Sequence, residues 1–182
     1  MRYIAGVAVA LGFCSMALGA DSGMAPSKVF DRDIRIIESE LVPLAEAMPA
    51  EKYNFAPTHG EFSGVRTFGQ EVSHIASVIH MCAASALEEP IPDAGPGENG
   101  PASLKTKDDI VKYLKEAFVH AHKAAANLTS ANLTDMVAPA FGKNKVPRVS
   151  MVTVFGWHSF DHYGQMVVYA RMNGIIPPAS RK

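Results

Sequence analysis

Cysteine is scarce in this chain, which has only Cys14 and Cys82 among its 182 residues. Cys14 lies in an N-terminal segment that we expect to be removed, as argued below, so the mature protein would retain Cys82 alone. A single cysteine excludes an internal disulfide, even in an oxidising compartment. The fold must therefore be stabilised by its apolar core, with or without a bound metal ion.

An excess of charge of one sign is also missing. The chain has 17 Lys and Arg against 18 Asp and Glu, and the two signs are mixed along the sequence. Because nucleic-acid binding normally requires a basic patch or stripe, we expect no nucleic-acid partner. The length suits one domain.

No apolar run is long enough to span a bilayer comfortably. After a positively charged start, an uncharged run extends from Tyr3 to Leu18, and small residues follow before the first acidic residue, Asp21. This layout is typical of a secretory signal peptide, and the run falls short of the roughly 20 residues of a membrane helix. We therefore expect a signal peptide over residues 1–20, a linker over 21–26, an exported (periplasmic or secreted) protein and no stable membrane span after cleavage.

Strand-like alternation of apolar and polar residues is absent, and four stretches have apolar residues at helical spacing instead. The predicted helices cover approximately residues 27–48, 65–86, 106–128 and 150–172. Two of the connections are long: Pro90 to Pro101, which reads as an exposed crossover, and Asn132 to Arg148, which reads as a loop. The pattern predicts an all-α bundle over 27–182, and the long connections argue against simple up-and-down order.

Two histidines four residues apart, His158 and His162, lie within the apolar stripe of the last predicted helix. Residues at this spacing have Cβ atoms about 5–6 Å apart, so both rings can reach one ion at the roughly 2.0–2.1 Å typical of zinc. Ordinary core histidines with local hydrogen bonds are the alternative. A metal ion has the advantage of satisfying both buried imidazoles at once.

A third ligand has to come from another part of the chain. His74 is the best candidate, because it lies on the flank of the apolar arc of the second predicted helix. His80 falls on the polar side of that helix, where a solvated side chain is expected. His120 and His122 point to nearly opposite sides and cannot bind one ion together, while His59 lies in a loop that places no constraint on it.

Three histidines would leave one coordination position open, as in catalytic rather than structural zinc sites. Asp161, next to His162, is a candidate to orient a ligand or accept a proton. Tyr169 is a candidate to line the cavity and assist proton transfer. A solvated acid and a locally satisfied core residue are the respective alternatives. Cys82 falls on an apolar stripe, which predicts an inert buried thiol.

Several segments together resemble the DinB/YfiT superfamily of metal-binding helical bundles, which is distinct from the similarly named DNA polymerase. The segments that carry the resemblance are Phe55 to Pro57, Val65 to Gln70, Val72 to Ala76, His158 to Gln165, Val167 to Tyr169 and Asn173 to Pro178. The resemblance implies a four-helix bundle in up-down-down-up order. It also implies a divalent ion, zinc or nickel, bound by three histidines that correspond in position to His74, His158 and His162.

Activity transfers less directly, since the family includes thiol transferases, a hydrolase-like isomerase group and members without a known reaction. We expect a metal-dependent enzyme that activates water for hydrolysis, because export separates the protein from a cytosolic thiol cofactor. A metal-dependent thiol transferase and a non-catalytic metal- or ligand-binding bundle are the alternatives. Family members often dimerise, and a second apolar side of the last helix, with Trp157, Phe160 and Val167, makes a homodimer plausible.

Overall fold

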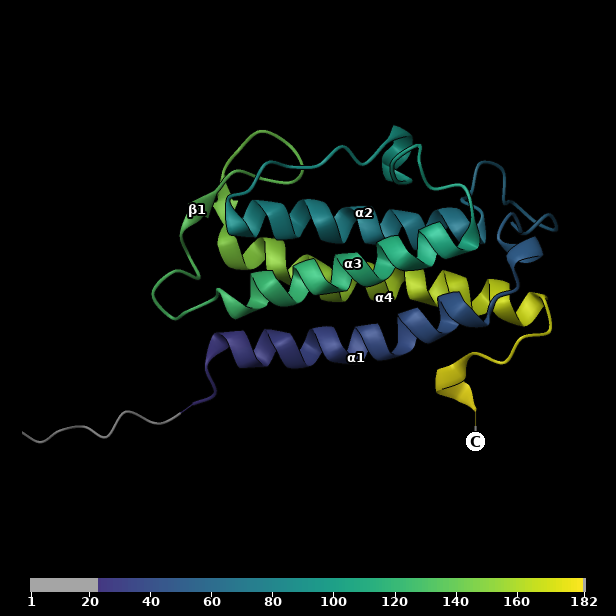
Figure 1. The fold of residues 1–182 in the computed structure, drawn as a ribbon, viewed down its shortest axis with the longest axis horizontal. Coiled ribbons are helices and arrows are strands. Elements are labelled where there is room, and N and C mark those ends of the chain that lie inside the picture. The colour runs from purple at the N-terminus through teal and green to yellow at the C-terminus, as the bar shows by residue number, and fades with distance from the viewer. Residues whose placement is uncertain (1–22, 182) are drawn as a thin grey trace, which may run out of the picture.

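Four helices run side by side in the computed structural model, which describes residues 23–181 (Figure 1). They are α1 (Pro26–Ala47), α2 (Phe68–Leu87), α3 (Lys107–Ala126) and α4 (Arg148–Met172). Following the colours along the chain, α1 and α4 run in one direction and α2 and α3 in the other. The expected all-α bundle in up-down-down-up order, with long connections after the second and third helices, is confirmed. The predicted signal peptide lies outside the described residues.

Each of the two central helices begins at a threonine that fixes its first turn. The Thr67 hydroxyl accepts a hydrogen bond from the backbone N–H of Gln70, and the Gln70 side chain accepts one from the Thr67 N–H. Thr106 and Asp109 form the same reciprocal pair at the start of α3. Such capping boxes satisfy N–H groups that a helix leaves unpaired. Consequently α2 starts at Phe68, slightly later than the periodicity alone predicted.

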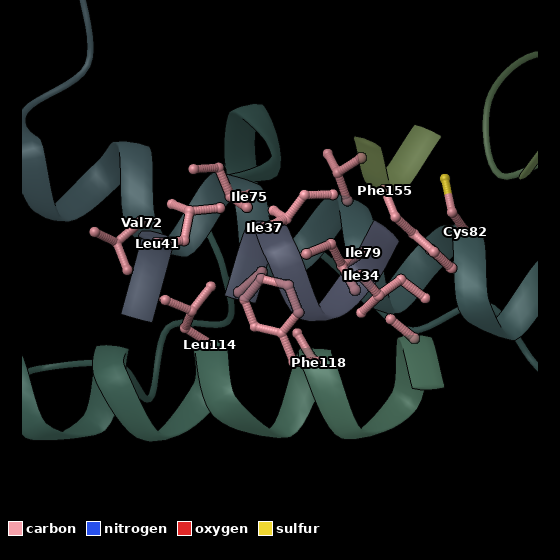
Figure 2. Close-up of a cluster of buried hydrophobic side chains, with 14 of the residues drawn as sticks. Ile34, Ile37, Leu41, Val72, Ile75, Ile79, Cys82, Leu114, Phe118 and Phe155 are labelled. Carbon is pink, nitrogen blue, oxygen red and sulfur yellow. The ribbon is translucent and has the colours of Figure 1, made fainter. Parts of the chain in front are cut away.

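The packing places α2 between α3 and α4, while α1 covers the opposite side of the same two helices. Buried apolar side chains from all four helices meet along the axis (Figure 2). The core includes Ile34, Ile37, Leu41, Val72, Ile75, Ile79, Leu114, Phe118 and Phe155. Because α2 is enclosed on most sides, its polar residues Glu71, Ser73, His74 and Ser77 are buried as well. Buried polar groups require hydrogen-bond partners or a ligand.

The connections differ from the sequence-based expectation in two places. The segment from Asn132 to Arg148 contains a small antiparallel pair, β1 (Met136–Val137) and β2 (Val146–Pro147), rather than loop alone. The segment after α2 was predicted to be an exposed crossover, yet it includes a 3-10 turn, η2 (Pro96–Glu98), that packs on α2. Gly100 has a φ of +91° there, and a Cβ atom on it would lie 2.6 Å from the Leu104 side chain. The Leu104 side chain could move away, but the positive φ favours glycine at this position.

Two further short turns are η1 (Ala50–Lys52), before α2, and η3 (Pro178–Ser180), after α4. Within residues 23–181 no helix combines the length and the apolar character that crossing a bilayer requires.

Replacing the core residue Phe118 by Ala should lower the free energy of unfolding by about 3–5 kcal/mol, because it leaves a cavity between the helices. Val119→Ala is the matched control: Val119 is the adjacent residue on α3 and 71% exposed, so its change should stay within about 0.5 kcal/mol. Urea denaturation followed by circular dichroism measures both. Equal losses in the two variants would contradict the packing of α3.

Candidate metal centre

Three histidine side chains from two helices converge in the interior of the bundle. His74 projects from α2, and His158 and His162 project from α4 one turn apart; one ring nitrogen of each lies within 4.8 Å of the others. The Nε2 atoms of His74 and His158 are 3.2 Å apart. Two nitrogens bound tetrahedrally to one ion at about 2.0–2.1 Å would be separated by roughly 3.3 Å. The arrangement is therefore compatible with binding of one metal ion.

Hydrogen bonds on the outer side hold two of the three rings. The Nδ1–H of His74 donates to the backbone carbonyl of Glu98, at 3.1 Å. The Nδ1–H of His162 donates to the carboxylate of Glu71, at 2.6 Å. When Nδ1 carries the proton, a neutral imidazole presents its lone pair at Nε2. Partners of this kind fix the tautomer and orientation of metal-binding histidines in known sites.

Glu71 is a site residue that the analysis of the sequence missed. Its side chain is 2% exposed, and it bridges α2 to α4 through His162. The signal was present, since Glu71 precedes His74 by three residues and therefore shares a helix face with it. Glu-x-x-His pairs of this spacing occur in the metal sites of other helical bundles. The carbonyl of Glu98 had no comparable signal, because a backbone group leaves no pattern in the sequence.

The electrostatic environment keeps two of the imidazoles neutral. Burial, reinforced by the nearby positive charge of Arg66, lowers the pKa of His74 to about 4. Burial and the two neighbouring histidines lower the pKa of His158 to about 3. The neutral form is the one that binds metals. In the part of the chain that the structure describes, the buried Nδ1 of His158 has no hydrogen-bond partner.

A pocket of about 380 Å³ opens beside this cluster. Its lining includes Arg66, Glu71, His162 and Gln165, together with Gly97 and Asn99 from the connection after α2. The Arg66 guanidinium donates to the Asn99 side chain at 2.8 Å and to the Gly97 carbonyl at 3.0 Å. The connection predicted to be an exposed crossover thus contributes one wall of the pocket.

The two residues predicted to assist catalysis lie in different surroundings. Asp161 is exposed on α4 and is not among the residues that line the pocket. Tyr169 is buried; its hydroxyl donates to the backbone carbonyl of Arg66 at 3.3 Å, and its ring packs edge-on against Phe55. Burial raises the pKa of Tyr169. The hydroxyl of Tyr169 therefore contacts the backbone of Arg66.

The remaining histidines lie outside the cluster. His59 is exposed in the loop before α2. His122 is bonded to Asp31 and Glu38 of α1. His80, expected to be solvated, is instead half-buried against α3, where it contacts His120.

Cys82 is buried, as expected. Burial raises the pKa of its thiol to about 12, so this residue remains a protonated thiol near neutral pH.

Comparison with known proteins supports the assignment of the fold. The model of the DinB superfamily matches residues 34–166, a range that contains the three histidines of the cluster. The crystal structure of a DinB-like protein from Bacillus cereus superposes with a TM-score of 0.64 at 17% identity, covering 83% of this chain and 95% of that one. A DinB-like protein from Bacillus subtilis gives 0.63 at 19% identity, covering 85% and 99%. Among curated proteins, none matches this chain.

Proposed function

The chain belongs to the DinB superfamily, and on that premise we propose that it binds a divalent metal ion, zinc or nickel, and catalyses hydrolysis. The ligands are His74, His158 and His162. The observation that carries the proposal is the convergence of three imidazoles beside an open pocket whose lining includes Glu71 and Arg66.

The donor set fits such an ion. His74 and His162 are turned by their outer hydrogen bonds so that Nε2 faces the cluster. Burial keeps the pKa of His158 low, so this ring is neutral as well. An ion held by three protein ligands with one position free supplies activation of water as a nucleophile.

Glu71 is the residue that we assign to proton transfer. It is bonded to His162 and lines the pocket, so its carboxylate lies where it can accept a proton from a molecule bound there. Asp161 lacks this position because it is exposed outside the pocket lining. Tyr169 acts as a positioning residue, because its hydroxyl holds the backbone of Arg66.

Arg66 indicates the charge of the substrate. A guanidinium has five N–H donors, of which Asn99 and the Gly97 carbonyl occupy two. The other donors are available to an anionic group in the pocket, and Arg binds carboxylates strongly through paired hydrogen bonds. We infer a small ester or amide that carries a carboxylate near the bond to be cleaved.

Export, inferred from residues 1–20, favours hydrolysis over thiol transfer, since a thiol substrate would have to be supplied outside the cytosol. The buried Cys82 does not provide one.

The three-histidine site should hold its ion tightly. The chain from Asp21 onward, purified without chelators or a His tag, should contain about one divalent ion per chain by elemental analysis after desalting. His158→Ala and His162→Ala should abolish this content. Glu71→Gln should weaken binding by about 10–100-fold in a chelator competition, because it replaces the charged hydrogen-bond partner of the His162 ligand by a neutral one.

Asp161→Asn serves as the control, since its exposed carboxylate should leave the affinity unchanged. Unaltered metal content in both histidine variants would refute the ligand set. Metal binding without turnover on any ester or amide would instead support a non-catalytic binding bundle, and turnover only with an added thiol would support a thiol transferase.

The substrate prediction compares an ester that carries a carboxylate with its neutral methyl-ester analogue. Arg66→Met should raise KM for the carboxylate substrate by about 10–100-fold, as expected for the loss of a charge-assisted contact worth roughly 1.5–3 kcal/mol. KM for the neutral analogue should remain unchanged, which also shows that the variant is folded. Equal effects on both substrates would exclude an anion-binding role.

We also propose that the protein forms a homodimer through the outer side of α4. Trp157, Phe160, Val168 and Met172 are all exposed apolar residues of this helix, and grouped apolar exposure favours association. Val167, expected to belong to this side, packs instead against the core. Trp157 also contacts the ring of His158 edge-on, so the dimer surface would adjoin the metal centre.

Trp157→Ser combined with Val168→Ser should convert a dimer into a monomer in sedimentation equilibrium, because the change makes the surface polar. Val119→Ser, at a site on α3 that is 71% exposed, is the control and should leave the dimer intact. A wild-type chain that is monomeric at all concentrations would contradict the proposal.

A further inference from the structure

A second pair of histidines lies on the side of α2 that faces α3. His80 of α2 and His120 of α3 approach through their Nδ1 atoms, which are 3.2 Å apart. This separation equals the Nε2 to Nε2 separation of His74 and His158 in the first centre. It also matches the roughly 3.3 Å expected between two nitrogens on one tetrahedral ion.

A carboxylate holds the outer nitrogen of one ring in the second pair as well. Glu89 accepts a hydrogen bond from the Nε2–H of His120 at 2.9 Å, and Lys123 holds the other oxygen of Glu89. When Nε2 carries the proton, neutral His120 presents its lone pair at Nδ1, toward His80. Glu89 therefore accepts a hydrogen bond from the outer nitrogen of His120, just as Glu71 does from the outer nitrogen of His162.

His80 differs from His120 in one respect, because its buried Nε2 has no hydrogen-bond partner among the described residues. Its ring packs on Tyr113, with the centroids 4.8 Å apart, which restricts its orientation. Burial, together with His120, lowers the pKa of His80, although the negative charge of Glu116 acts in the opposite sense. The shift favours the neutral form of the ring, which is the form that binds metal ions.

We propose that His80 and His120 form a second metal site, which binds a divalent ion that prefers imidazole ligands, such as zinc, nickel or copper. The ligand atoms are the two Nδ1 atoms, Glu89 is a positioning residue, and water completes the coordination. The His120 side chain is 18% exposed, so the site opens to solvent at the surface between α2 and α3. With two protein ligands against three, its affinity is lower than that of the first centre.

The same distance also fits a simple hydrogen bond in which one ring donates Nδ1–H to the other. The two interpretations differ in what happens when metal is added. A hydrogen-bonded pair takes up no ion, whereas in the proposed site the proton of His80 moves to its Nε2 and both Nδ1 atoms bind the ion.

Isothermal titration of the zinc-loaded mature chain with additional Zn²⁺ at pH 7.5 tests the proposal. We expect one further equivalent, bound more weakly than the first. His80→Ala and His120→Ala should each abolish it, and Glu89→Gln should weaken it by about 10–100-fold. His122→Ala is the matched control, because His122 lies on the same helix but is bonded to Asp31 and Glu38; this variant should retain the second equivalent.

The two centres are distinguishable in this experiment. His158→Ala should remove the tight equivalent and keep the weak one, while His120→Ala should do the reverse. If His120→Ala fails to fold, the variant His120→Gln, which keeps a polar side chain at this position, is used in its place. Absence of a second equivalent in the wild-type chain, or its survival in both the His80 and His120 variants, would overturn the proposal.

Discussion

The hydrogen bond between Glu71 and His162 is the interaction on which the centre depends. It joins α2 to α4 deep in the bundle, at 2.6 Å, and both side chains are almost fully enclosed. A carboxylate in such a place is costly unless it is paired. The bond therefore determines which nitrogen of His162 faces His74 and His158, and it holds a carboxylate at the edge of the pocket.

The order of the helices explains why histidines meet on two sides of α2. Up-down-down-up connectivity encloses α2 between α3 and α4, so residues on its opposite sides contact different partners. His74 faces the histidine pair of α4, and His80 faces His120 of α3. Because α2 and α3 run in the same direction, this order requires a long connection between them. That connection also supplies Glu98 and Asn99 around the first centre.

Much of the architecture could be predicted because helices leave a periodic record in the sequence. The apolar stripes and the Pro- and Gly-bearing connections identified four helices, and spacing alone placed His158 and His162 on one face. The remaining residues of the first centre and of the proposed second site were harder to predict. Glu71 was not predicted, although it shares a helix face with His74. His80 was expected to be solvated because the residues on the same side of its helix are polar. Its actual environment depends on α3, which covers that side.

By itself, the sequence determined the helical segments and which residues of one helix share a face, because these depend on contacts between residues a few positions apart. Only the tertiary structure decided which faces meet, that the Glu98 carbonyl orients His74, that Arg66 reaches Asn99, and that Tyr169 holds the backbone of Arg66. Those contacts join residues that lie far apart along the chain, and a one-dimensional pattern carries no record of the direction in which a connection brings them together.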